Sequence, residues 1–174
     1  SAFLTNIFNR LARSCFYGAA NVCDAHLPQV APHAEVMEAC RKATLEFERL
    51  AHGFDAHGAL AVAEELCRQE NKRWDDASKA AKGDDAAYEQ ALADAFCALR
   101  TVTLLMHPAV PSGCEKICEH MGFGAEDFFS WKHAFDGPVE LAATLGQTPV
   151  EHAIVPLPPR FDFFEKHPSQ VKKK

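Results

Sequence analysis

The sequence has no apolar run that approaches the roughly 18 residues needed to cross a membrane, and no signal peptide is apparent. It also has no excess of positive charge, since 18 Lys and Arg stand against 24 Asp and Glu for a formal net charge of -6. A free-standing nucleic-acid-binding domain is usually basic. We therefore expect a cytoplasmic protein with no membrane or DNA partner, although a local basic patch remains compatible with the total charge.

Several motifs of catalytic chemistry are missing as well. There is no G-x-S-x-G, no H-E-x-x-H, no glycine-rich phosphate loop and no clustered pair of acids of catalytic type. No segment alternates apolar and polar residues with a period of two, which is the pattern of a half-buried strand. The sequence therefore indicates neither a sheet nor a catalytic centre of these kinds.

Cysteine is present, but not in a disulfide or zinc pattern. The number of Cys is odd at seven, and no C-x-x-C occurs. Cys114 and Cys118 lie four residues apart near His120, but a zinc site would need a fourth ligand at a suitable spacing. We expect reduced, mostly buried thiols, no disulfide and no metal.

Apolar residues recur with helical spacing along most of the chain. Five main helices are expected, over about 3–20 and 32–53, then after caps at Asp55 and at Asp84 or Asp85, and over about 112–121. Short connections between helices of this length favour an antiparallel bundle, so the predicted fold is all-α. We place the helical domain at 1–160 and a partly disordered extension, with a disordered Lys172–Lys174 tail, at 161–174.

The first helix has an unusual polar side. Its apolar arc is formed by Leu4, Ile7, Phe8, Leu11 and Cys15. Asn9 and Arg13 lie one turn apart, roughly opposite that arc. An Asn amide and an Arg fork can together bond the edge of an unpaired base. From the helix alone, a solvated polar face is the simpler interpretation.

Four segments, in their order along the chain, resemble one family. They are TNIFNRLARSCF, ENKRWDDASKAAKGDD, ALRTVTLLMHPAVPSGCEKICEHMGF and VPLPPRF. Together they are similar to the C-terminal anticodon-binding domain of methionyl-tRNA synthetase, a class I aminoacyl-tRNA synthetase. Asn9 and Arg13 match the N-x-x-x-R of its first helix, and Trp74 matches a Trp between two later helices. Arg73 stands where the family usually has Pro.

The resemblance implies a function in translation. In this family the Asn, the Arg and the Trp meet the CAU anticodon loop of methionine tRNA, which assigns these roles to Asn9, Arg13 and Trp74. Arg10, Lys72 and Arg73 are further candidates for contacts with the RNA backbone. The spacing of Trp74 from Leu60 also fits a simple core residue.

The resemblance also implies a larger parent protein. The H-I-G-H-like and K-M-S-K-S-like motifs that bind ATP in the family's catalytic domain are missing here. We therefore expect a fragment that needs no cofactor of its own and does not activate methionine, while the parent enzyme, methionine–tRNA ligase, would use ATP. Its expected partners are methionine tRNA and the missing catalytic domain. A helical scaffold of this ancestry that no longer reads tRNA, and the anticodon domain of another class I synthetase, remain open as alternatives.

Overall fold

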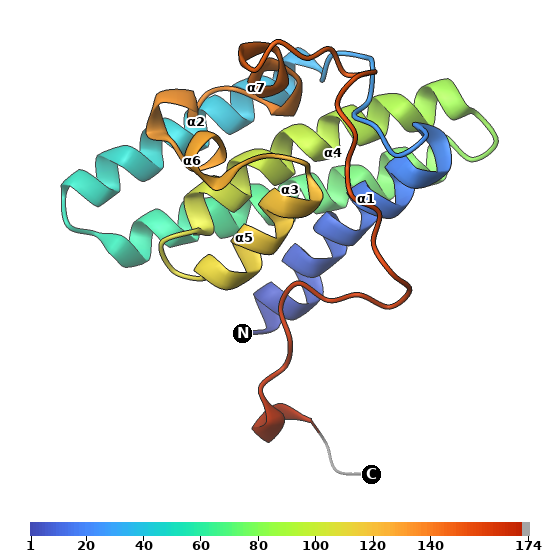
Figure 1. The fold of residues 1–174 in the computed structure, drawn as a ribbon. Coiled ribbons are helices and arrows are strands. Elements are labelled where there is room, and N and C mark those ends of the chain that lie inside the picture. The colour runs from blue at the N-terminus through green and yellow to red at the C-terminus, as the bar shows by residue number, and fades with distance from the viewer. Residues whose placement is uncertain (172–174) are drawn as a thin grey trace.

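The computed structural model describes residues 1–171 and consists of helices joined by loops (Figure 1). In chain order the helices are η1 (Phe3–Phe8, a π-helical turn), α1 (Asn9–Val22), α2 (Ala34–His52), α3 (Ala56–Ala80), α4 (Asp85–Met106), α5 (Pro111–His120), α6 (Ala125–Phe128), η2 (Trp131–His133), α7 (Pro138–Thr144) and η3 (Pro168–Gln170). The prediction of an all-α fold with antiparallel packing is confirmed. The sequence did not predict α6 or α7, which are short.

Two helices begin where their capping residues predict. The Asp55 carboxylate accepts a hydrogen bond of 2.8 Å from the backbone N–H of Gly58 and caps α3. The Asp84 carboxylate accepts one of 3.1 Å from Ala87 and caps α4. Gly83, with φ of +82°, makes the turn between these helices in a conformation that favours glycine. The local sequence thus determines where the chain breaks between α3 and α4.

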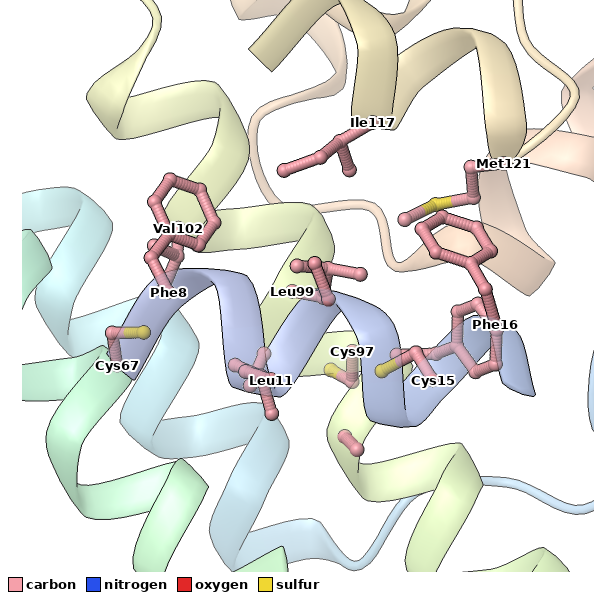
Figure 2. Close-up of a cluster of buried hydrophobic side chains, with 14 of the residues drawn as sticks. Phe8, Leu11, Cys15, Phe16, Cys67, Cys97, Leu99, Val102, Ile117 and Met121 are labelled. Carbon is pink, nitrogen blue, oxygen red and sulfur yellow. The ribbon is translucent and has the colours of Figure 1, made fainter. Parts of the chain in front are cut away.

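Helix α4 forms the centre of the bundle. It packs against α1, α2 and α3, and every residue from Ala91 to Met106 is buried. Figure 2 shows side chains of α1, α3 and α5 meeting those of α4 in this core. The residues predicted for the seam are all buried: Leu11, Leu66, Leu92, Leu99 and Val102.

A buried arginine of α4 anchors the segment that follows α5. Arg100 is 1% exposed, and its Nη2 donates a hydrogen bond of 3.2 Å to the carbonyl of His133. Its guanidinium also lies 4.3 Å from the ring centre of Phe128, a cation–π contact. Burial lowers the pKa of Arg100 to about 10. This cation therefore stays charged at neutral pH and holds α6 and η2 against α4.

The N-terminus of α2 is held by a carboxylate from α4. Asp94, which is buried, accepts hydrogen bonds of 2.7 Å from both the backbone N–H and the imidazole Nδ1 of His33. His33 is the residue that precedes α2. A carboxylate in this position satisfies a free helix donor and complements the helix dipole. Asp94 thus fixes α2 against the central helix.

The end of the described chain returns to α1. Figure 1 shows the segment after α7 running back beside α1. We call residues 158–164 the closing strap. Phe163 and Phe164 are 3% and 8% exposed, so the packed domain continues past residue 160, where the sequence placed its boundary. The predicted disorder of Lys172–Lys174 falls outside the described residues. Within residues 1–171, no helix combines the length and apolar character needed to span a bilayer.

We expect Leu99→Ala to lower the free energy of unfolding by about 2–5 kcal/mol, because a buried leucine is replaced by a cavity. Leu99 is fully buried, whereas Leu45 on α2 is 41% exposed. The matched variant Leu45→Ala should change stability by less than about 0.5 kcal/mol. Urea denaturation followed by circular dichroism measures both, and equal losses would contradict the packing of α4.

The His33–Asp94 contact predicts a pH dependence of stability. The hydrogen bond to Asp94 and the attraction of its charge raise the pKa of His33, Glu35 adds to this, and Arg73 opposes it. Because the folded-state pKa exceeds the unfolded value of about 6.5, the contact stabilises fully below that pH and is lost as pH rises through the folded pKa. An NMR titration of His33 gives the pKa, and unfolding at several pH values gives the stability. His33→Gln should remove this pH-dependent part of the free energy of unfolding, whereas His57→Gln, at an exposed position, should leave it intact.

Candidate nucleic-acid interface

An open groove of about 1040 Å³ runs between α1, the end of α3 and the start of α4. Arg10 and Arg13 of α1 and Trp74 of α3 line it together. The family resemblance had grouped these residues, although Trp74 lies more than sixty positions after the two arginines in the sequence. The packing of α1 against the α3–α4 hairpin therefore creates one surface from two distant segments.

Two aromatic rings lie at the base of the groove. Trp74 is 7% exposed and packs edge to face with Tyr88, at a centroid distance of 5.3 Å and an interplanar angle of 76°. Tyr88 is half-buried, and burial raises its pKa. A Cβ at Gly18 would lie 2.6 Å from the Leu92 Cδ2 methyl and displace it, so glycine favours the close approach of α1 at this point. The indole is thus mainly a core group, as its spacing from Leu60 indicated, and only a small part of it reaches the groove.

The groove is more positive than the chain as a whole. Arg10, Arg13, Lys79 and Lys82 line it, against the two carboxylates of Asp75 and Asp85. Lys79 and Lys82 were not among the residues predicted for the site. Asp75, Ser78 and Lys79 follow the i, i+3, i+4 spacing of one helix face, and this pattern could have identified Lys79, whereas Lys82 lies beyond the end of α3 in the turn before α4.

Two other candidates for RNA contact do not line this groove. Arg73 instead faces α2, where its Nη1 lies 2.7 Å from Glu35 and its Nε lies 3.1 Å from the buried Glu70. Burial raises the pKa of the Glu70 carboxyl. Lys72 is exposed elsewhere on α3. The structure therefore separates Arg73 and Lys72 from Trp74, because neighbouring residues of a helix point in different directions.

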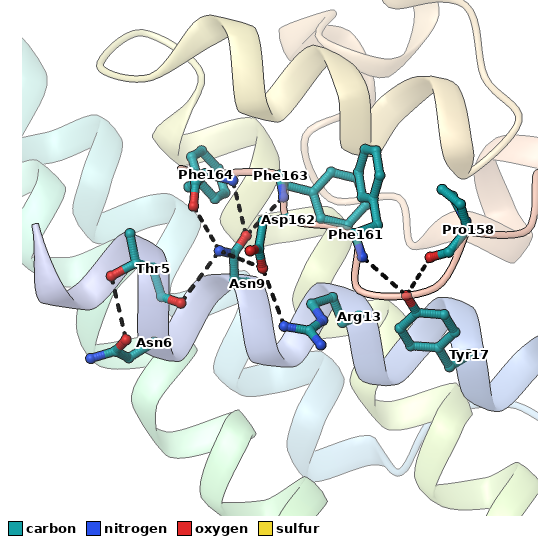
Figure 3. Close-up of polar contacts among 10 residues, drawn as sticks. All are labelled: Thr5, Asn6, Asn9, Arg13, Tyr17, Pro158, Phe161, Asp162, Phe163 and Phe164. Carbon is teal, nitrogen blue, oxygen red and sulfur yellow. Dashed lines mark hydrogen bonds and ion pairs between the residues drawn. The ribbon is translucent and has the colours of Figure 1, made fainter. Parts of the chain in front are cut away.

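Asn9 binds the closing strap (Figure 3). Its Oδ1 accepts hydrogen bonds of 3.0 Å from the backbone N–H groups of Phe163 and Phe164, and its Nδ2 donates one of 2.8 Å to the carbonyl of Phe164. The residue is 2% exposed. The expectation that Asn9 lies on a solvent-facing side of the first helix is wrong, because the strap covers that side.

Arg13 and Tyr17 continue this polar row toward the C-terminus of α1. Arg13 Nη1 lies 3.2 Å from Asp162 Oδ1. The Tyr17 hydroxyl donates a hydrogen bond of 2.6 Å to the carbonyl of Pro158 and accepts one of 3.4 Å from the N–H of Phe161. One face of α1 therefore holds the strap through side chains spaced four residues apart, and Arg13 lies where that face meets the groove.

The candidate zinc residues are packed into the protein instead of forming a cluster. Cys114 and Cys118 are both buried, and the Cys118 thiol donates a hydrogen bond of 3.3 Å to the carbonyl of Phe123. Burial raises the pKa of Cys118 to about 12, which disfavours the thiolate that binds metal. In the part of the chain that the structure describes, no three His, Cys, Asp or Glu residues form a group able to hold a metal ion.

We expect Asn9→Ala to destabilise the domain by about 1–3 kcal/mol, because it leaves buried backbone groups of the strap without partners. Hydrogen exchange at the Phe163 and Phe164 amides should accelerate in parallel. Asn6, exposed on the preceding π-helical turn η1, provides the control. Asn6→Ala should change stability by less than about 0.5 kcal/mol, and an equal effect of the two variants would refute the assignment of Asn9.

Comparison with known proteins gives a match at the level of the fold. No protein-family model matches the sequence, and no curated protein matches it significantly. Among solved structures, Mycobacterium tuberculosis methionyl-tRNA synthetase in complex with methionyl-adenylate superposes with a TM-score of 0.66 at 20% identity, over 92% of this chain and 31% of that one. The apo form of the same enzyme gives a TM-score of 0.67 at 20% identity, over 95% and 32%. The chain thus spans about a third of the length of these proteins and shares the fold of one part of methionyl-tRNA synthetase.

Proposed function

We propose that this domain is the anticodon-binding module of a methionine–tRNA ligase and that its groove receives the CAU anticodon loop of methionine tRNA. The observation that carries the proposal is the convergence of Arg10, Arg13 and Trp74 on one open groove. The likeness of the whole fold to part of methionyl-tRNA synthetase supports it. The ligase reaction itself, with its ATP and methionine, would belong to a separate catalytic domain acting in the cytoplasm.

The size and lining of the groove suit an unpaired loop. Its volume of about 1040 Å³ lies just above the roughly 300–1,000 Å³ typical of small-molecule pockets. Proteins read single-stranded RNA by stacking splayed bases on aromatic or Arg planes and by bonding their exposed edges. Tyr88 and the accessible part of Trp74 supply surfaces for stacking, while Arg10, Arg13, Lys79 and Lys82 supply charge for the phosphates.

The structure changes the role that we propose for Asn9. The Asn9 amide is already hydrogen-bonded to the backbone of the strap. We therefore propose that Asn9 fixes the strap, and that the strap in turn fixes the position of Arg13. Arg13 then becomes the main contact that α1 offers to the anticodon loop, with its guanidinium placed to bind an RNA phosphate. Arg10 joins Lys79 and Lys82 as a backbone contact, and Lys72 and Arg73 are left outside the proposed interface.

One observation favours a second candidate, a helical scaffold that no longer reads tRNA. Each arginine proposed for RNA contact is paired with a carboxylate of the same chain, and the net charge is -6. An anticodon domain of another class I synthetase is a third candidate. Binding specificity separates the three, since only the first requires a preference for CAU over other loops.

The test is a titration of RNA stem-loops with CAU or scrambled loops, followed by fluorescence anisotropy at low salt. Wild type should prefer CAU. Lys79→Ala should weaken binding to both loops, and it should reduce the slope of log K against log salt by about 0.7, the value for one phosphate of a single strand. Lys116→Ala on α5, which does not line the groove, is the matched control and should change neither quantity.

The role of the aromatic rings is tested on Tyr88, because Trp74→Ala would also remove core packing. Tyr88→Ala should cost roughly 1–3 kcal/mol of binding if a base stacks there, and Tyr88→Phe should retain most of the affinity. Thermal melting of each variant checks that the fold is kept. Equal binding of CAU and scrambled loops by the folded wild type would reject reading of the methionine anticodon and leave the scaffold and the anticodon domain of another class I synthetase.

A further inference from the structure

Both arginines of the groove are already engaged by carboxylates of this chain. Arg10 Nη2 lies 2.7 Å from Asp75 Oδ1, and Arg13 Nη1 lies 3.2 Å from Asp162 Oδ1. These are the donor groups that a phosphate entering the groove would need. The two carboxylates come from different elements, Asp75 from α3 and Asp162 from the closing strap.

We propose that Asp75 and Asp162 are internal competitors of the RNA backbone, so that binding exchanges two arginine–carboxylate pairs for two arginine–phosphate pairs. This inference rests on the function proposed above and adds a device that limits its affinity. In the free protein the pairs hold both guanidinium groups at the groove while neutralising them. In the complex the displaced carboxylates face phosphate and oppose it.

The exposure of the pairs makes such an exchange feasible. The Arg10 and Asp75 side chains are 55% and 23% exposed, and those of Arg13 and Asp162 are 40% and 48% exposed. Exposed pairs of this kind hold weakly, so phosphate can displace them, and each carboxylate should reduce affinity by about two- to fivefold. The competition therefore weakens binding without preventing it.

The second pair links the groove to the strap. Asp162 precedes Phe163 and Phe164, whose burial and hydrogen bonds to Asn9 fix the strap on α1. The packing of Phe163 and Phe164 therefore places Asp162 beside Arg13. The charge available in the groove depends on whether the strap is seated.

The test is the affinity of Asp75→Asn and Asp162→Asn for an RNA stem-loop with a CAU loop. Each variant should bind about two- to fivefold more tightly than wild type at low salt. The slope of log K against log salt should steepen by up to about 0.7 per released arginine. Asp76→Asn is the matched control, since it removes the same charge beside Asp75 from an exposed residue outside the groove lining. It should change affinity by less than about twofold.

A second pair of variants checks the mechanism. We combine Arg13→Gln with Asp162→Asn, and Arg10→Gln with Asp75→Asn. Neither double variant should show the tighter RNA binding of the single Asp→Asn variant, because the arginine that this substitution releases is then missing. Unchanged hydrogen exchange at the Phe163 and Phe164 amides should show that the strap stays seated in Asp162→Asn. Faster exchange there would assign the gain to release of the strap and overturn the proposal.

Two outcomes separate this inference from the proposed function. If wild type binds RNA but Asp75→Asn and Asp162→Asn bind no more tightly than Asp76→Asn, the competition is refuted and the RNA-binding groove remains. If neither wild type nor any variant binds RNA, the proposed function fails and the competition fails with it.

Discussion

The burial of α4 on every side is the constraint on which the rest of the structure depends. A helix whose residues from Ala91 to Met106 are all buried must be covered by neighbours all the way round. The α1, α2 and α3 helices supply most of that cover, and the elements after α5 complete it through Arg100. Because α1 must lie against α4 at Gly18, it also lies beside Tyr88 and Trp74, and the groove results from this placement.

The first helix is used on more than one side. Its apolar side packs into the core around α4, and its polar row of Asn9, Arg13 and Tyr17 binds the strap. A buried amide that satisfies three backbone groups is costly to replace, since each group would otherwise be left without a partner. This explains a polar residue at Asn9 without any ligand. Arg13 is different, because it is 40% exposed and lies at the edge of the groove.

Local charge, and not total charge, decides what the groove can bind. The chain is acidic overall, yet four basic side chains line this groove together with two aromatic rings. The pairs with Asp75 and Asp162 moderate that field. In the proposed function, this combination of charge and aromatic surface would serve an anionic ligand with flat surfaces for stacking, such as single-stranded RNA.

The sequence alone determined the helical class, the cap at Asp55, a second cap at Asp84 or Asp85 and the buried seam through Leu92, Leu99 and Val102, because these features depend on spacing within one helix. Its resemblance to a known family also selected Arg13 and Trp74, which the structure brings to one groove. Helical periodicity shows which side of a helix is apolar, but it cannot show that a distant polar segment will cover the other side. The burial of Asn9 under the strap, the turning of Arg73 toward Glu35 and the pairing of Arg13 with Asp162 were therefore decided by tertiary structure, since each depends on a partner far away in the chain.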